Sequence, residues 1–244
     1  MTVSAQAAAE AADAPFSSEA LDRLVSILGT DEARELRAEI LGLLAEGLPA
    51  DGRAARSHRT RRAIVEAMRA LHAEGDLRPR ASCIAERAGV GKRTVWQQFA
   101  DMEALLVEAS RRDLEILLTM LSPIDTGLPL DERITRFVTR NARIYERMAP
   151  GWRAARLHEP FSAGLRRSKQ RNTALGKAEI EAVFAPELRR LAGQRRAELT
   201  AALVGVGFWP FWESLRTDAG AGPEQARDIV ATLLTASLTQ GAVT

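Results

Sequence analysis

Cysteine and histidine are scarce in this chain of 244 residues, which contains one cysteine, Cys83, and three histidines. A lone cysteine excludes an internal disulfide framework and any zinc site built from several cysteines. Three scattered histidines argue against a histidine metal cluster. We therefore expect no cofactor, and we interpret Cys83 as a small buried residue, because a redox sensor would need an exposed thiolate.

Long apolar runs and catalytic groupings are also missing. No stretch approaches the roughly 18 to 20 apolar residues that a membrane span needs, and no basic start is followed by an apolar signal segment. The sequence shows no Ser/His/Asp or Cys/His grouping, no phosphate-binding glycine loop and no clustered carboxylate pair. We expect a cytoplasmic protein that is neither an enzyme nor a membrane protein.

Charge is unevenly distributed, although the net charge of the chain is only +2. Residues 1–50 contain nine acidic and three basic side chains, a net charge of −6, whereas residues 51–100 contain eleven basic and five acidic side chains, a net charge of +6. Only three of the 34 basic residues are lysines, so a single arginine carries little information and only clusters count. The first hundred residues are thus an acidic segment followed by a basic one.

Apolar residues recur at helical spacing along most of the chain, and no segment shows the alternation of a strand. After an alanine-rich start we expect a helical pair within residues 18–46, and we interpret residues 48–62 as a flexible basic linker. We expect further helices from residue 63 to Gly75 and at about 80–88, 92–99, 101–121, 131–148, 151–158, 162–184, 187–217 with a break near Gly193, and 223–240. The predicted class is all-α.

The stretch IAERAGVGKRTVWQQF, residues 84–99, combines two short helices with a glycine between them. Ala85 is small enough for two helices to cross, and Gly89 permits the tight turn. With Ile84, Val90 and Val95 facing inward, this is the spacing of a helix-turn-helix. The alternative is an ordinary helical hairpin. Arginine, lysine and glutamine on the outer side of the second helix could bind base edges in the DNA major groove.

Residues 61–105 resemble the N-terminal domain of the TetR family of transcriptional regulators, through RRAIVEAMRALHAEG, IAERAGVGKRTVWQQF and ADMEALL. MAPGWRAARLHEPF, VFAPELRRLA and FWESLRTDAGAGPEQAR are similar to the variable effector domain of one branch of that family. The resemblance implies a three-helix helix-turn-helix DNA-binding domain with a basic arm (residues 51–100) and a larger helical domain for effector binding and dimerisation (residues 101–244). The acidic extension, residues 1–50, is the part of the chain that resembles the family least.

The resemblance also implies which residues touch DNA. Lys92, Arg93 and Trp96 would face base edges, and an arginine arm within residues 53–62 would lie near the minor groove or the phosphates. The predicted DNA-binding residues are Arg59, Arg61, Arg80, Ser82, Lys92, Arg93, Thr94, Trp96, Gln97 and Gln98. Trp96 could instead pack on the protein surface, and the arm could be a solvated linker.

Two departures from the family pattern concern the DNA contacts. Pro79 and Arg80 stand where relatives usually carry serine or threonine, so the cap and the phosphate contact of the first short helix are in question. Gly91 replaces a common serine, and Arg93 occupies a position that is commonly glycine. The extra arginine suggests a guanine in the DNA target.

Large side chains concentrate in residues 137–212, where a TetR-like protein encloses a small-molecule cavity. The candidate ligand-binding residues are Phe137, Tyr145, Trp152, Phe161, Phe208, Trp209 and Trp212; each could equally be plain aromatic core. Arg153, Arg156 and His158 could lie at the mouth of such a pocket. The basic segment LRRSKQR, residues 165–171, is interpreted as a solvated helix face.

The predicted function is that of a TetR-type repressor which binds a palindromic double-stranded DNA operator as a homodimer and is released by an unknown small-molecule effector. The last two helices would form the dimer interface. The alternatives are a regulator without a small ligand, controlled by a partner protein, or an activator. The acidic extension could pack on its own chain, dock a partner, or compete with DNA for the arginine-rich surface.

Overall fold

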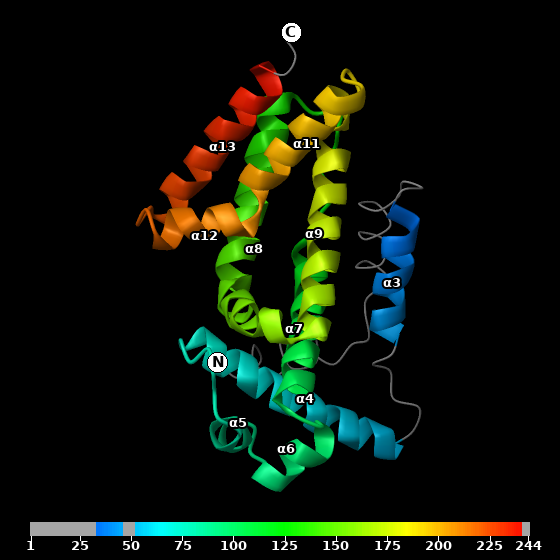
Figure 1. Ribbon diagram of the computed structural model, residues 1–244, viewed down its shortest axis with the longest axis vertical. Helices are drawn as coiled ribbons and strands as arrows, with labels where there is room; N and C mark the ends of the chain where they lie inside the picture. The colour runs from blue at the N-terminus through cyan, green and yellow to red at the C-terminus, as the bar shows by residue number, and fades with distance from the viewer. Residues whose placement is uncertain (1–32, 46–51, 241–244) are drawn as a thin grey trace, which may run out of the picture.

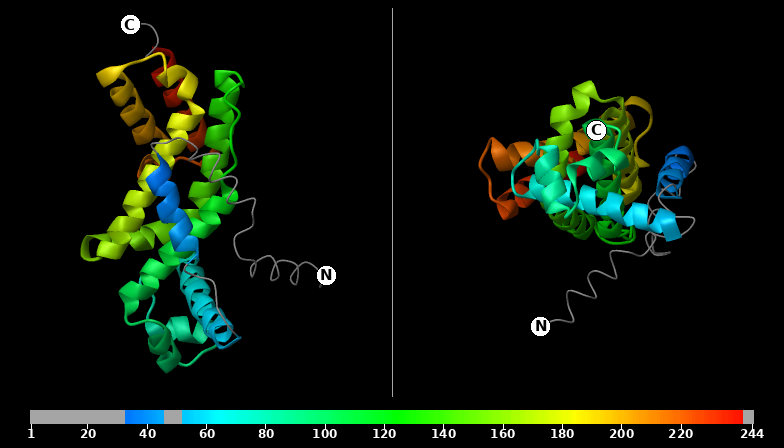
Figure 2. Two further views of the ribbon diagram at one scale, coloured as in Figure 1. Left: turned by 90° about the vertical axis from the view of Figure 1, so that its right-hand side faces the viewer. Right: turned by 90° about the horizontal axis from the view of Figure 1, so that it is seen from below.

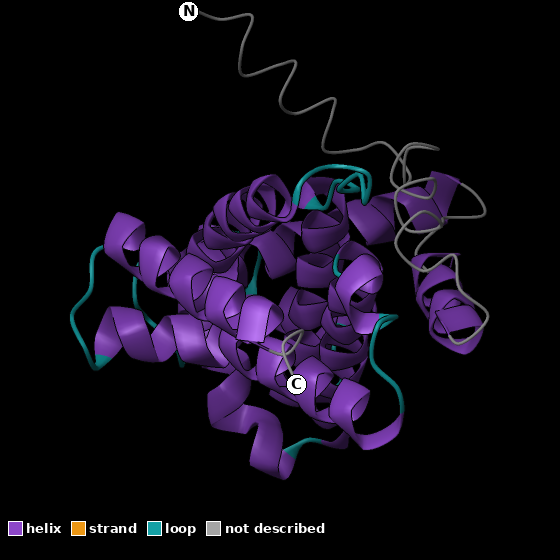
Figure 3. Ribbon diagram, turned by 90° about the horizontal axis from the view of Figure 1, so that it is seen from above, coloured by secondary structure: helices purple, strands orange, loops and turns teal. Residues whose placement is uncertain are grey.

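The computed structural model describes residues 33–45 and 52–240, and every regular element in these ranges is helical (Figure 3). The all-α prediction is confirmed for this part of the chain. The helices are α3 (Arg34–Ala45), α4 (Gly52–Ala73), α5 (Ala81–Arg87), α6 (Lys92–Gln98), α7 (Met102–Met120), α8 (Leu130–His158), η2 (Glu159–Phe161), α9 (Ala163–Val183), α10 (Ala185–Leu188), α11 (Gly193–Gly207), α12 (Trp209–Thr217) and α13 (Pro223–Gln240). None of these helices is both long enough and apolar enough to cross a membrane.

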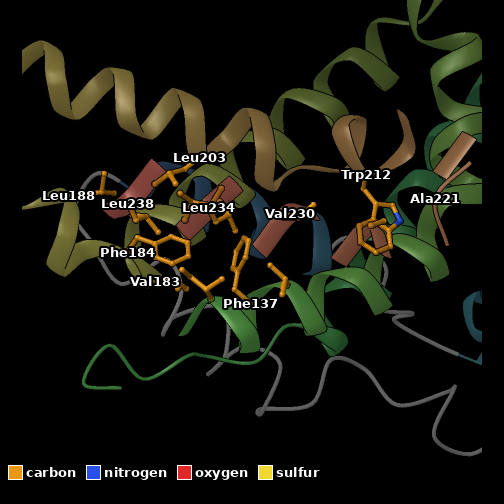
Figure 4. Packing of buried hydrophobic residues seen from close by; sticks show 14 residues of the cluster. Phe137, Val183, Phe184, Leu188, Leu203, Trp212, Ala221, Val230, Leu234 and Leu238 are labelled. Carbon is orange, nitrogen blue, oxygen red and sulfur yellow. The ribbon is translucent and has the colours of Figure 1, made fainter. Parts of the chain in front are cut away.

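The molecule is elongated, with α4, α5 and α6 at one end and α11 and α13 at the other (Figures 1 and 2). At the first end, Ile64 and Met68 of α4 are buried against Ile84, Val95 and the start of α7. At the other end, Phe137 and Phe184 meet edge to face, with ring centroids 5.6 Å apart, in a cluster that includes residues of α11 and α13 (Figure 4). α7, α8 and α9 connect the two ends.

Local capping signals in the sequence set two of the helix starts. The carboxylate of Asp101 accepts a hydrogen bond from the backbone N–H of Ala104 (2.7 Å), and the hydroxyl of Ser162 accepts one from the N–H of Leu165 (3.1 Å). Each side chain satisfies one of the N–H groups that a helix start leaves free. The predicted starts of α7 and α9 are therefore confirmed.

The prediction of a flexible linker over residues 48–62 is wrong for residues 52–62, which form the first half of α4. The residues between Gly52 and Gly75 include no glycine or proline, and arginine is a good helix former. Tertiary contacts hold this half in place, since the hydroxyl of Ser57 donates a hydrogen bond to Oε1 of Gln98 at the end of α6 (3.1 Å). The basic arm is therefore a helix packed on the rest of the chain.

Two further boundaries differ from the prediction. α8 continues through Pro150, where a break was expected, and Figure 1 shows α8 bending in its lower part. A proline removes one helical N–H bond, but its φ angle suits a helix, so packing on both sides can keep the helix continuous. The break predicted near Gly193 is present between α10 and α11. A second break was not predicted: α11 ends at Gly207, because the chain becomes extended at Phe208 before α12 begins at Trp209.

The acidic extension contributes α3, which lies along α9 (Figure 1). Ile40 of α3 is fully buried in a cluster with Leu117, Leu121 and Leu175, and Glu39 lies 3.5 Å from Arg171 of α9. The first helix predicted in the extension falls outside the described residues. The described part of the extension packs on its own chain, beside α9 and away from α6.

Candidate functional site

α5 and α6 form a two-helix unit around a tight turn. Gly89 adopts φ +67°, a conformation that other residues rarely take, and the N–H of Val90 donates to the carbonyl of Ala85 (3.0 Å). Ile84, Ala85 and Val95 are at most 3% exposed and pack under α4. The turn and the buried residues that the sequence predicted therefore hold α6 against α4 with its other side facing outward.

The outward side of α6 is basic and polar. Lys92, Arg93, Trp96 and Gln97 are exposed, and the exposed fraction of Trp96 is 40%. Thr94 and Gln98 are half-buried, and Gln98 is held by Ser57 as described above. Because α6 contains no acidic residue, this surface is uniformly basic or neutral.

Several basic side chains around α6 have no acidic partner in the part of the chain that the structure describes. Arg59, Arg80, Lys92 and Arg93 are exposed and form no ion pair within the described residues. Most other arginines of α4, α5 and α7 are paired; Arg87, for example, bonds Glu74 through both guanidinium nitrogens at 2.7 Å. An uncompensated basic surface attracts an anionic partner.

The start of α5 lacks a side-chain cap. Arg80 occupies the N-cap position with extended φ and ψ angles, but its side chain makes no capping hydrogen bond. Ser82 is exposed one residue inside the helix. The free guanidinium of Arg80 and the hydroxyl of Ser82 thus remain available at this end of α5.

Arg61, predicted to touch DNA, is largely engaged inside the protein. Its Nη1 donates to the carbonyl oxygen of Gln98 (2.5 Å), its guanidinium lies 4.1 Å from the ring centroid of Phe99, and its Nη2 is 3.6 Å from Glu108. These contacts fasten the end of α6 to α4 and α7. Arg59 points to solvent, and the side chain of Arg53 falls outside the described residues.

A cavity of about 280 Å³ lies between α7, α8, α9 and the junction of α11 with α12. Four of the seven candidate ligand-binding aromatics line it: Tyr145, Trp152, Phe208 and Trp209. The Trp152 ring lies 6.1 Å from that of Tyr145 and 5.5 Å from that of Trp209, centroid to centroid, so the three rings form one continuous wall.

The other three candidates lie elsewhere. Phe137 is 1% exposed in the core beside α13, and Trp212 is also buried in this cluster (Figure 4). The indole N–H of Trp212 donates a hydrogen bond to Glu146 (2.9 Å). Phe161 is 86% exposed on η2. The sequence could not distinguish cavity-lining aromatics from core aromatics. Helical periodicity predicts which side of a helix is buried, but not whether that side faces a cavity or another helix.

α9 supplies cavity residues that the sequence analysis missed. Ser168, Asn172 and Gly176 line the cavity, and the ring of Phe208 lies so close to Gly176 that a Cβ there would stand 2.6 Å from it. Residues 165–171 are not a purely solvated face, since Ser168 and Arg171 are each only 6% exposed. A spacing of four from Ser168 through Asn172 to Gly176 is the signal that could have identified this small, polar stripe.

The three residues predicted at the mouth of the pocket lie in different places. Arg156 lines the cavity and is exposed, whereas Arg153 is paired with Glu213 at 2.6 Å, outside the cavity lining. His158 interacts with His72 of α4, and its partial burial, together with the charge of Arg78, lowers its pKa. Only Arg156 of the three predicted residues lies at the cavity.

One buried ion pair joins the cavity region to α4. Asp113 of α7 accepts a hydrogen bond from Arg69 of α4 (2.8 Å), and burial raises the pKa of Asp113 to about 6 although Arg69 opposes the shift. Gly151 of α8 lies against the same carboxylate, where a Cβ would be 2.4 Å from Oδ2. The next residue, Trp152, is part of the cavity wall. Asp113 thus links α4 to Gly151, the residue beside the cavity wall.

His72 provides a pH-dependent feature of α4. Its side chain is 3% exposed, both ring nitrogens lack a hydrogen-bond partner among the described residues, and burial lowers its pKa to about 4. Asp76 partly opposes this shift, while Arg69 and His158 add to it. The unfolded chain binds a proton at His72 below pH 6.5 that the folded chain does not bind until about pH 4.

We therefore expect the stabilisation that His72 contributes to be present above pH 6.5 and lost as the pH falls to 4. Relative to His72→Leu, the wild type should lose about 3 kcal/mol of unfolding free energy over that range. Urea denaturation of the wild type and of His72→Leu at pH 7 and pH 4 checks this. A stability difference between wild type and His72→Leu that is the same at both pH values would contradict the prediction.

Comparisons with family models, with curated proteins and with solved structures gave no match for this chain. Within residues 33–45 and 52–240, no group of three or more histidine, cysteine, aspartate or glutamate residues is placed to hold a metal ion. The function therefore rests on two sites, the outward side of α6 and the cavity between α7, α8 and α9.

Proposed function

We propose that this protein is a TetR-type transcriptional regulator that binds DNA through a helix-turn-helix formed by α5 and α6. The observation that carries the proposal is the outward side of α6, where Lys92, Arg93, Trp96 and Gln97 are exposed on a buried scaffold and the two cations have no acidic partner among residues 33–45 and 52–240. A short helix of this kind can enter the major groove, where Arg and Lys bind O6 and N7 of guanine and Gln binds adenine.

The surrounding groups suit the DNA backbone. Arg80 and Ser82 at the start of α5 and the exposed Arg59 of α4 can bind phosphates on either side of the groove. Thr94, half-buried beside Arg93, can reach a base or a phosphate. Arg61 and Gln98 act in this proposal mainly by holding α6 at its angle to α4.

The cavity supports control by a small molecule. A ligand that moves Trp152 would also move Gly151 against Asp113, and Asp113 is bonded to Arg69 of α4. α4 in turn carries the contacts that hold α6. We therefore propose a repressor whose affinity for its operator falls when an effector occupies the cavity.

A homodimer would place two α6 helices on one palindromic operator. The outer sides of α11 and α13 carry small or apolar exposed residues, among them Ala201, Gly205 and Leu233, that a second copy could cover. We expect light scattering at micromolar concentration to give the mass of two chains. A monomer under these conditions would contradict the dimeric arrangement.

Selection from random DNA duplexes tests the proposed function directly. We expect the wild type to enrich a palindromic sequence with a guanine in each half-site, with an affinity that falls steeply as salt rises. Arg93→Ala should lose the preference at that guanine, at a cost of roughly 1 to 3 kcal/mol of discrimination, while the rest of the site stays the same. No enriched sequence for the wild type would refute the proposed function, and an unchanged preference in Arg93→Ala would refute the role of Arg93.

A further inference from the structure

The chemistry of the cavity wall restricts what it can hold. Its greater part is apolar and aromatic, since Leu117, Ile144 and Leu175 face it together with the continuous wall of Tyr145, Trp152 and Trp209. Its volume of about 280 Å³ is at the small end of ligand pockets. An aromatic ligand of about two fused rings would fit such a space and stack against the wall.

Most charged side chains that line the cavity already have an oppositely charged partner within the protein. Glu179 is fully enclosed and bonded to Arg140, and burial raises its pKa. Lys169 bonds Glu159 at 2.9 and 3.1 Å. The remaining charged lining residue, Arg156, is exposed to solvent at the rim. A charged group on a ligand inside the cavity would therefore be desolvated without a counter-charge, which is strongly unfavourable.

Two polar atoms in lining residues have no hydrogen-bond partner among the described residues. They are Oδ1 of Asn172 on α9, an acceptor, and Nε1 of Trp209 on α12, a donor, and less than 1 Å² of each is exposed to solvent. Buried polar groups are nearly always hydrogen-bonded, so each atom indicates a missing partner. Both residues line the cavity, and a small turn of either side chain toward it would let a bound molecule supply that partner. The hydroxyl of Tyr145, by contrast, already donates to the carbonyl of Gly207 (2.5 Å).

We infer that the cavity binds an uncharged, fused-ring aromatic compound that carries one hydrogen-bond donor and one acceptor, as a ring amide does. The ring system lies against Tyr145, Trp152 and Trp209, its N–H donates to Asn172, and its carbonyl oxygen accepts from the indole N–H of Trp209. Only the description of this compound as the effector rests on the proposed function; the binding chemistry follows from the cavity alone.

Three probes of nearly equal size separate the contributions of hydrogen bonding, apolar contact and charge to ligand binding. 2-Quinolinone is an uncharged ring amide, naphthalene lacks the polar groups, and 2-naphthoate carries a negative charge at pH 7. Equilibrium dialysis against the purified wild-type protein should give an affinity for 2-quinolinone about tenfold or more above that for either of the other probes. Tighter binding of 2-naphthoate, equal binding of naphthalene, or no binding of 2-quinolinone would each overturn the inference, and these wild-type measurements need no variant to fold.

Variants then assign the polar contacts. Asn172→Leu and Trp209→Phe should each weaken 2-quinolinone binding roughly fivefold and leave naphthalene binding within about twofold, since each removes one hydrogen bond and keeps the apolar surface. Phe161→Ala, at an exposed aromatic outside the cavity, is the matched control and should bind both probes as the wild type does. An equal loss for both probes in Asn172→Leu and Trp209→Phe would overturn the assigned contacts.

The dialysis contains no DNA, so its result is separable from the proposed function. If the duplex selection enriches a site while 2-quinolinone fails to bind, the ligand class is wrong and DNA binding stands. If 2-quinolinone binds as expected while no duplex is enriched, the ligand class stands and the proposed function fails.

Discussion

A Lys92→Ala/Arg93→Ala double variant should bind the selected operator at least about 30-fold more weakly than the wild type, because each contact to a base edge contributes roughly 1 to 3 kcal/mol. Both side chains are exposed and form no ion pair within the described residues, so their removal leaves no buried charge and the fold should be retained. Fluorescence anisotropy with a labelled duplex, measured between 50 and 200 mM salt, checks the affinity and its salt dependence.

The matched control removes the same charge elsewhere. Arg189 and Arg190 follow α10 and are likewise exposed without an ion pair among the described residues. The segment that leads from α10 into α11 lies at the end of the molecule opposite α6 (Figure 1). Arg189→Ala/Arg190→Ala should bind within about threefold of the wild type, since two distant charges contribute little at physiological salt. If both double variants lose affinity equally, binding reflects net charge and not a surface on α6.

Arg133→Ala should destabilise the protein by about 3 to 5 kcal/mol, the largest effect on stability that we expect from a single substitution. The guanidinium of Arg133 bonds Glu187 at 2.5 and 2.9 Å, and it also donates to the backbone carbonyls of Val183 and Leu128. The exposed fractions of the two charged side chains are 4% and 10%. Removing Arg133 would leave the carboxylate of Glu187 buried without its partner.

An exposed ion pair one turn away on the same helix provides the control. Arg136 bonds Glu132 at 2.6 Å, and their side chains are 55% and 44% exposed. Arg136→Ala should change the unfolding free energy by less than about 1 kcal/mol, because water screens an exposed pair. Urea denaturation of both variants at pH 7 makes the comparison; similar losses in the two would mean that burial does not set the strength of the Arg133 pair.

These two arginines also show where sequence-based prediction ends. The sequence places Arg133 and Arg136 three residues apart on one helix and does not distinguish them. Burial separates them, because Arg133 faces Glu187, which lies 54 residues further along the chain. The same applies to Arg61 and Arg59: both were predicted to touch DNA, but only Arg61 meets Phe99 and Gln98 across the fold.

The residues that line the cavity show the same limit of prediction from sequence. Aromatic composition drew attention to seven residues, of which four line the cavity, while Asn172 and Gly176 of α9 were missed because they are neither aromatic nor charged. Asn172 and Gly176 line the cavity together with Phe208 and Trp209, which belong to the distant junction of α11 with α12. No pattern within a single helix contains that information.

The sequence by itself determined the features that depend on neighbours along the chain. The all-α class, the caps of α7 and α9, the turn at Gly89 and the basic outward side of α6 all follow from spacing and residue type, because helical periodicity and capping are local. Tertiary structure alone decided the pairing of Arg61 and Arg133, the continuity of α8 through Pro150, the place of α3 beside α9 and the composition of the cavity. Each of these depends on which distant helix lies opposite, and that is settled by packing the whole chain at once.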